Sequence, residues 1–174
     1  MSVRQLLKFT KNIKAIAFDL DGTLIHSMVK VNVNNYNLNK FRKHDFSFRL
    51  DSDEYYTWIR PHTRSILPKL SEHYKLYVFT KASRRYADQV IMQLFGKTDI
   101  FSGRFYRDSF YVHESKNVKL ITPEKIILVD DNLTNKSGED NEIFYHIPPY
   151  NFFSENDSEL LEFLFYLQDN KQII

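Results

Sequence analysis

Three short apolar runs, separated by segments with helical periodicity, set the strongest limit on the fold of this chain. The runs IKAIAFDL (13–20), LYVFT (76–80) and KIILVDD (125–131) have the length and aliphatic content of strands that are buried on both faces. Between the second and third runs, SRRYADQVIMQLFG (83–96) repeats apolar residues at helical spacing and ends in a glycine. Buried strands that alternate with helices are typical of a parallel sheet. We therefore predict an α/β fold, a Rossmann-like parallel sheet flanked by helices.

Three further segments extend this prediction. HTRSILPKL (62–70) is predicted to form a helix that Pro68 either kinks or causes to start late. EIFYHI (142–147) is predicted to be a fourth strand, and DSELLEFLFYL (157–167) a last helix with an acidic first turn.

The segment at about 28–60 does not follow this alternation of buried strands and helices. It alternates polar and apolar residues and contains Asn-rich turns, which predicts a small β insertion. The insertion is too short for a separate domain or for a helical cap over an active site. Because the chain has no internal repeat and no Gly/Pro-rich linker, we predict one domain over residues 1–174.

The composition excludes several function classes. The 174 residues are 43% hydrophobic and 26% charged, as in soluble globular proteins, and the formal net charge of +2 is too small to indicate a nucleic-acid or membrane partner. The chain has no cysteine, which excludes disulfides, thiolate metal sites and a cysteine nucleophile. Without a signal peptide or membrane span, we expect a cytoplasmic or nuclear monomer. The abundance of Asn, Lys and Ile would also fit a bacterial protein that acts inside a host cell.

Polar side chains follow each of the three apolar runs. Asp19 and Asp21 follow the first, Thr80 follows the second, and Asp130 and Asp131 follow the third. Each alone has an ordinary explanation, as an Asp-Gly turn, a helix N-cap or a solvated turn. The carboxyl ends of parallel strands meet at one edge of a sheet, however, so these groups can converge there. Their convergence predicts an active site that handles a phosphate or a metal ion.

The same motifs resemble those of the haloacid dehalogenase (HAD) superfamily of aspartate-nucleophile phosphotransferases. Within it, the chain is most similar to the SCP/FCP-type small phosphatases that act on the C-terminal domain of RNA polymerase II. The resemblance covers residues 13 to about 168 and implies a HAD-type fold. It rests on DLDGTLIHS (19–27), RPH (60–62), VFT and YAD (78–80 and 86–88), YRDSFYVHESKNVK (106–119) and ILVDDN (127–132).

The resemblance assigns different roles to the two aspartates of the first motif. Asp19 would attack phosphorus and form an aspartyl-phosphate, and Asp21 would exchange protons with the leaving oxygen and the attacking water. It also implies a Mg²⁺ ion, which neutralises repulsion between a carboxylate and an anionic phosphate. Its ligands would be the Asp19 carboxylate, the Asp21 carbonyl and Asp131, with Asp130 as a ligand or an orienting residue.

The remaining motifs supply groups that contact the phosphate. Thr80 would donate a hydrogen bond to a phosphoryl oxygen, and a lysine would neutralise its charge. The spacing from the family histidine assigns this lysine to Lys119, with Lys116 as the second candidate. Arg107 resembles a family arginine near the phosphate pocket, although a structural salt bridge explains it equally well.

Three departures from the SCP/FCP pattern are visible. Gly22 stands where that group usually has glutamate, and Lys81 and Ala82 replace a small pair of residues after Thr80. The segment between Lys119 and the third strand is short, so we expect its helix to be shortened or lost. None of these changes removes a catalytic group.

The predicted function is Mg²⁺-dependent hydrolysis of phosphate monoesters on protein side chains, either phosphoserine and phosphothreonine or phosphotyrosine, since an uncapped site admits a large substrate. One alternative is a phosphatase for small molecules, and a less favoured one is an inactive module that binds phosphoproteins. The aromatic and basic residues of the insertion either line a peptide groove or pack the insertion onto the sheet. They are Tyr36, Phe41, Phe46, Phe48, Tyr55, Tyr56 and Trp58, with Lys40, Arg42 and Lys43.

Overall fold

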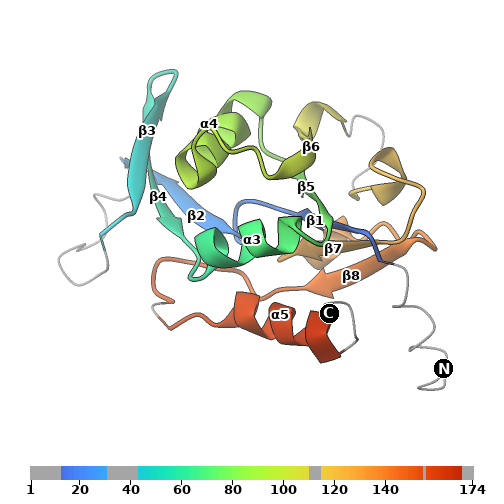
Figure 1. Cartoon of the computed structure of the whole chain (residues 1–174). Coiled ribbons are helices and arrows are strands. Elements are labelled where there is room, and N and C mark those ends of the chain that lie inside the picture. The colour runs from blue at the N-terminus through green and yellow to red at the C-terminus, as the bar shows by residue number, and fades with distance from the viewer. Residues whose placement is uncertain (1–12, 31–42, 110–114, 155, 170–174) are drawn as a thin grey trace.

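The computed structural model describes residues 13–30, 43–109, 115–154 and 156–169, and all elements and contacts below lie within these ranges (Figure 1). The expectations for four residues of the insertion fall outside them, namely Tyr36, Lys40, Phe41 and Arg42.

The main sheet has five parallel strands in the order β6-β5-β1-β7-β8. The central strand β1 pairs with β5 on one side and with β7 on the other, and all four of its residues are buried. This arrangement confirms the predicted α/β fold. The strands are β1 (Ala15–Phe18), β5 (Lys75–Phe79), β6 (Phe101–Phe105), β7 (Ile126–Asp130) and β8 (Glu142–His146).

The two faces of the sheet are covered differently. Ile16 and Phe18 point to a large core that contains the apolar sides of three helices, α3 (Thr63–Ser71), α4 (Arg84–Phe95) and α5 (Glu159–Asp169). Ala15 and Ala17 point to a smaller core on the other face, where Val118 of a short 3₁₀ helix packs. This helix, η3 (Val118–Leu120), lies in the connection where a shortened helix was expected.

The sequence patterns located most element ends to within a few residues. Helix α3 begins at Thr63 with Pro68 in its interior, so the proline does not delay the start. Ser83 caps α4 by accepting a hydrogen bond from the Tyr86 backbone, and Gly96 ends it with a φ of 65°. Strand β6 was not predicted.

A second, antiparallel sheet lies beside α4 in Figure 1. Its strands, in the order β2-β4-β3, are β2 (Ile25–Val29), β3 (Phe46–Leu50) and β4 (Asp53–Ile59). The strand-rich insertion therefore begins slightly before residue 28. That residues 1–174 form a single domain remains a prediction.

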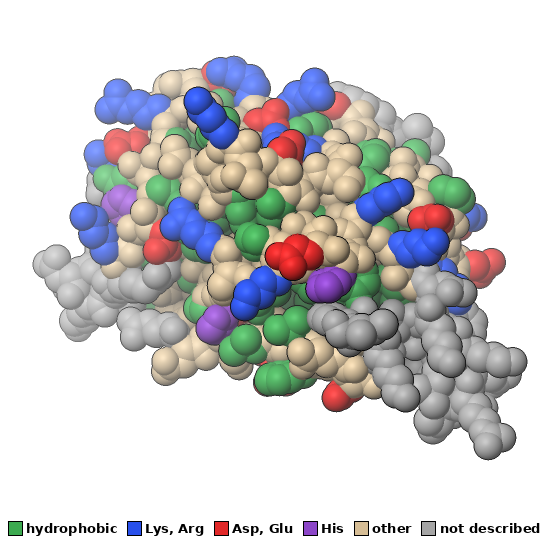
Figure 2. Space-filling view, viewed as in Figure 1, with side chains coloured by type: hydrophobic (Ala, Val, Ile, Leu, Met, Phe, Trp, Pro, Cys, Tyr) green, Lys and Arg blue, Asp and Glu red, His purple; other side chains and the backbone are tan. Residues whose placement is uncertain are grey.

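The surface in Figure 2 carries lysines and arginines interspersed with acidic side chains. On this face no cluster of one charge stands out, in keeping with the small net charge. Among the helices that the structure describes, none has the length and apolarity needed to cross a membrane.

Candidate active site

Asp19 lies directly after β1, at the carboxyl edge of the main sheet. Its backbone N–H donates to the Val129 carbonyl at 3.0 Å, which extends the β1–β7 pairing by one residue and fixes where the side chain emerges. The side chain of Asp19 lies 2.9 Å from the Lys116 ammonium. Only 8% of the residue is exposed, so burial raises the pKa of Asp19, while the attraction of Lys116 opposes that rise.

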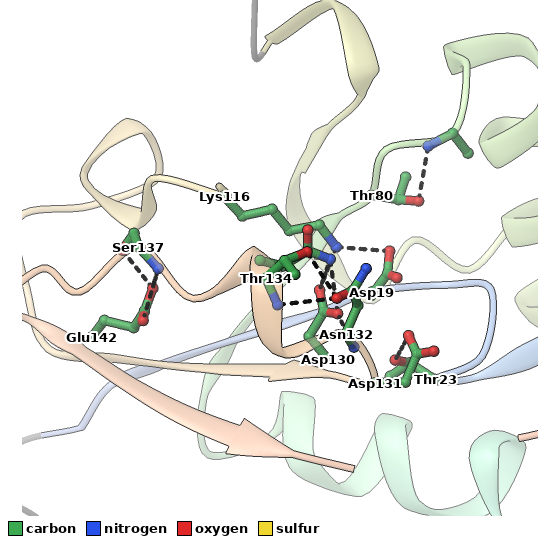
Figure 3. Close-up of polar contacts among 12 residues, drawn as sticks. Asp19, Thr23, Thr80, Lys116, Asp130, Asp131, Asn132, Thr134, Ser137 and Glu142 are labelled. Atoms are coloured by element: carbon green, nitrogen blue, oxygen red, sulfur yellow. Dashed lines mark hydrogen bonds and ion pairs between the residues drawn. The ribbon is translucent and has the colours of Figure 1, made fainter. Parts of the chain in front are cut away.

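Asp130 is a fully buried acceptor at the end of β7 (Figure 3). One of its oxygens accepts from the Asn132 backbone at 2.8 Å and from the Asn135 amide at 2.9 Å. The other accepts from Lys116 at 2.6 Å and from the same amide at 3.0 Å. Because both oxygens are engaged by protein donors, Asp130 is better suited to orienting Lys116 than to holding a metal.

The structure places the two lysines considered for the phosphate contact in different surroundings. Lys119 lies on η3, is exposed, and forms an ion pair with Glu139 at 2.5 Å. Lys116 instead is fully buried between the carboxylates of Asp19 and Asp130. The second of the two candidates is therefore the lysine that reaches the site.

Asp21 has surroundings different from those of Asp19. The hydroxyl of Tyr86, on the first turn of α4, donates to Asp21 Oδ1 at 2.6 Å. Burial raises the pKa of Asp21 to about 7, although the Tyr86 hydrogen bond acts in the opposite direction. A carboxyl group with such a pKa can both give and take a proton near neutral pH. Sequence reasoning gave Tyr86 no role, although the YAD motif contains it.

Asp131 lies next to the tight turn that follows Asp19. Gly22 occupies this turn with a φ of 80°, a conformation that favours glycine. A side chain at this position would overlap the Asp131 carboxylate. Burial, together with the charges of Asp19 and Asp130, raises the pKa of Asp131 to about 6.

Asp19 and Asp131 can hold a cation, and the Asp130 carboxylate lies close to both. Asp19, Asp130 and Asp131 each offer an oxygen, and the three oxygens lie within 4.8 Å of one another. The Asp19 oxygen beside Lys116 is buried and has no hydrogen bond of suitable geometry. The cluster holds three carboxylates and one ammonium, that of Lys116, which contacts Asp19 and Asp130. A divalent cation therefore fits both the charge and the carboxylate oxygens of Asp19 and Asp131.

Thr80 follows β5 and is almost completely buried. Its N–H donates to the Phe105 carbonyl at 2.9 Å, and its hydroxyl accepts from the Ala82 backbone at 3.1 Å. Ser83, not Thr80, caps α4, so the alternative that Thr80 is the helix N-cap does not apply.

A cavity of about 390 Å³ opens beside some of these groups. Asp19, Asp21 and Thr80 line it together, as the sequence predicted, and Lys81 and Arg107 line it as well. The Arg107 guanidinium donates to the Lys81 carbonyl at 2.8 Å, which holds the two cationic residues side by side. The cavity thus combines reactive carboxylates with positive charge suited to an anionic substrate.

A buried arginine holds the loop after Asp19 in place. Arg60 donates to the Thr23 carbonyl at 2.8 Å and forms an ion pair with Asp157 at 3.0 Å. The Tyr150 N–H donates to the Gly22 carbonyl at 2.7 Å. The RPH motif therefore contributes support for the loop that carries Asp21.

Gly22→Ala is expected to weaken binding of a divalent cation while the chain still folds. A methyl group at this position would displace the Asp131 side chain, and the positive φ would add strain of about 1 kcal/mol. Titration of wild type and variant with Mn²⁺, followed by electron paramagnetic resonance, measures the effect. Gly138→Ala is the matched control, because Gly138 also has a positive φ but no neighbouring atom where a Cβ would lie. Equal affinities in the two variants would contradict this account.

The family was identified by comparison with known proteins. A model of the NLI interacting factor-like phosphatases matches residues 14–173, nearly the whole chain. The chain belongs to this phosphatase family. The family resemblance seen in the motifs is thereby confirmed.

Curated relatives of this NLI interacting factor-like phosphatase include polymerase phosphatases. An RNA polymerase II C-terminal domain phosphatase of Caenorhabditis elegans is 31% identical over 79% of the chain and 21% of its own length. A human CTD small phosphatase-like protein is 26% identical over 87% of the chain and 54% of its own length. The chain thus spans between about a fifth and a half of the length of these relatives.

Solved structures show the same fold. The structure of Fcp1, an essential RNA polymerase II CTD phosphatase, covers 97% of the chain and half of the Fcp1 chain, with a TM-score of 0.62 at 23% identity. A fission yeast Fcp1 variant bound to beryllium fluoride aligns over 88% of the chain and 45% of its own, also with a TM-score of 0.62, at 24% identity. At these identities the likeness concerns the fold alone.

Proposed function

We propose that this NLI interacting factor-like phosphatase hydrolyses phosphate monoesters on protein side chains through an aspartyl-phosphate intermediate on Asp19. One observation carries the proposal. Asp19 and Asp21 leave the same strand end and line the same cavity, yet Asp19 contacts the Lys116 cation and Asp21 accepts from the neutral Tyr86 phenol. Two carboxylates in such different surroundings are suited to two different chemical tasks.

In the first step the Asp19 carboxylate attacks phosphorus, and the bond between phosphorus and the substrate oxygen breaks. Asp21, in its protonated form, gives its proton to that leaving oxygen. In the second step a water attacks the phosphorus of the aspartyl-phosphate, and Asp21 accepts a proton from this water. Asp19 is regenerated and inorganic phosphate leaves, so both aspartates return to their starting state.

Lys116 and Thr80 would stabilise the phosphoryl oxygens. Lys116 is held in place by Asp130, so its charge beside Asp19 needs little reorganisation during the reaction. The Thr80 hydroxyl accepts from the Ala82 N–H, which leaves its own proton for a phosphoryl oxygen.

A Mg²⁺ ion would be held by the carboxylates of Asp19 and Asp131 and by the Asp21 carbonyl. When bound, it would offset the repulsion between the Asp19 carboxylate and the substrate phosphate. Asp130 would act as the orienting residue, since its oxygens already accept hydrogen bonds from Lys116 and Asn135.

The proposed substrate is a phosphorylated protein. The relatives' names state that they act on the C-terminal domain of RNA polymerase II or resemble such enzymes, which favours phosphoserine and phosphothreonine. Phosphotyrosine remains an alternative, because Tyr55 also lines the cavity and offers an aromatic face. Lys81 and Arg107 at the cavity would attract acidic residues near the phosphate.

We also propose a cytoplasmic or nuclear location and a monomeric state. The relatives named above include proteins of a nematode and of humans, and they lend no support to a bacterial protein acting in a host cell.

A comparison of phosphoserine, phosphothreonine and phosphotyrosine peptides, each with Mg²⁺ and with EDTA, tests the function and the metal together. We expect turnover of at least one peptide with Mg²⁺, loss of turnover in EDTA, and recovery when Mg²⁺ is returned. Free sugar phosphates and nucleotides serve as competitors for the small-molecule alternative.

Three outcomes would contradict the proposal. Turnover that persists in EDTA would show that the reaction does not need a divalent metal ion. Faster turnover of a free metabolite than of every peptide would favour a small-molecule phosphatase. Binding of peptides without any turnover would instead support the inactive binding module.

A further inference from the structure

We propose that Tyr86 is a positioning residue that fixes the Asp21 carboxyl group and determines which of its oxygens carries the proton. The inference rests on the proposed function, because it concerns the proton transfer that Asp21 would perform. It goes beyond that function by naming a residue outside the strand-end motifs on which this transfer depends.

The contact between the two side chains is short and buried. The Tyr86 hydroxyl donates to Asp21 Oδ1 at 2.6 Å, and Tyr86 is only 9% exposed. Tyr86 belongs to the first turn of α4, where its backbone N–H donates to the Ser83 cap. The phenol therefore projects from a capped helix end, and its position is set independently of the loop that carries Asp21.

The hydrogen bond makes the two oxygens of Asp21 unequal. A phenol hydroxyl donates one proton, which is directed at Oδ1. A carboxylic acid carries its proton on one oxygen, and an Oδ1 that already accepts from Tyr86 leaves Oδ2 to carry it. Oδ2 is then the atom that gives the proton to the leaving oxygen and later takes one from water.

The hairpin of the second sheet holds the Tyr86 ring. The ring centroid lies 5.6 Å from that of Phe48 on β3 and 5.5 Å from that of Tyr55 on β4. Phe48 and Tyr55 also stack on each other at 5.3 Å. The structure thus shows Phe48 and Tyr55 in a packing role. They hold the Tyr86 ring, and Tyr86 in turn holds the Asp21 carboxyl group by its hydrogen bond. A contribution of Tyr55 to the cavity is compatible with it.

Tyr86→Phe is expected to slow hydrolysis only of those substrates whose leaving group needs a proton. For a phosphoserine peptide, whose alkoxide is a poor leaving group, kcat/KM should fall about 10-fold to 100-fold. For 2,4-dinitrophenyl phosphate, whose leaving group departs without a proton, kcat/KM should change by less than about 3-fold. The ratio of the two values, measured on one preparation, does not depend on the fraction of folded enzyme.

Three other variants complete the experiment. Asp21→Asn should lower kcat/KM for the phosphoserine peptide more strongly than Tyr86→Phe does, again with little effect on 2,4-dinitrophenyl phosphate. The double variant should lose little more activity than Asp21→Asn alone, because both changes affect the same proton transfer. Tyr145→Phe is the matched control, because this β8 tyrosine packs against Phe163 of the core and should leave the ratio unchanged. Tyr55→Ala, which removes one side of the ring contact, should repeat the selective loss in smaller measure.

The outcomes separate the inference from the function beneath it. If Tyr86→Phe lowered kcat/KM equally for both substrates, while Asp21→Asn lowered it mainly for the phosphoserine peptide, the role of Tyr86 would be overturned. The proposed function would still stand. A wild-type enzyme that cleaves neither substrate would overturn the proposed function and the inference with it.

Discussion

Asp19→Asn is expected to abolish hydrolysis of 4-nitrophenyl phosphate, with a loss in kcat of at least about 10⁴-fold, while the chain keeps its fold. An amide oxygen is a poor nucleophile and carries no charge for a metal ion, so both proposed roles of Asp19 are lost. The Lys116 ammonium keeps Asp130 as its partner, so the fold should tolerate the change. Stopped assays of turnover, with circular dichroism and thermal melting, measure the two effects.

Asp140→Asn is the matched control for this change. Asp140 is an exposed aspartate that does not line the cavity, and its replacement should leave kcat unaltered. If Asp19→Asn retained even a few per cent of the wild-type turnover, another nucleophile would have to be sought.

Lys116→Met is expected to reduce both activity and stability. The Lys116 ammonium is fully buried between Asp19 and Asp130, and its removal leaves the buried Asp130 carboxylate without its cation. Loss of one partner from a buried ion pair costs about 3 kcal/mol or more in the free energy of unfolding. Loss of charge stabilisation at the phosphoryl oxygens should also lower kcat by about 10²-fold to 10³-fold. Urea unfolding and turnover assays measure these effects.

Lys119→Met provides the comparison, since Lys119 is exposed and its ion pair with Glu139 lies outside the cavity. This variant should match the wild type in turnover and in urea midpoint. A larger loss of activity for Lys119→Met than for Lys116→Met would restore the assignment expected from motif spacing and refute the one drawn from the structure.

The central part of the fold could be predicted because strands that are buried on both faces appear in the sequence as continuous apolar runs. β1, β5 and β7 lie in the middle of the sheet, so their residues are apolar on both faces and the runs are continuous, apart from Lys75 at the start of β5 and Asp130 at the end of β7. β6 lies at the edge, and its FSGRF sequence mixes polar and apolar residues, with only Phe101 buried. The serine, glycine and arginine in the middle of β6 interrupt its apolar pattern, whereas β8 at the other edge keeps a continuous apolar run that could be predicted.

The site could be predicted in part for a related reason. Asp19, Thr80 and Asp131 directly follow β1, β5 and β7, and Asp21 lies two residues beyond Asp19, so the strand predictions located all four. Lys116 and Lys119 both lie in a connection, where family spacing does not fix the path of the backbone. The sequence therefore could not show that Lys116, and not Lys119, is buried against Asp130. Tyr86 contacts Asp21 only through tertiary packing, which helical periodicity does not reveal.

The most direct test of the central claim is detection of phosphate covalently bound to Asp19. The enzyme is mixed with a ³²P-labelled phosphoserine peptide and Mg²⁺, quenched in acid within milliseconds, and examined for labelled protein before and after hydroxylamine treatment. We predict label on the wild type that hydroxylamine releases, as expected of an acyl phosphate, and none on Asp19→Asn. Rapid turnover without any labelled protein at any quench time, or equal labelling of Asp19→Asn, would contradict the account.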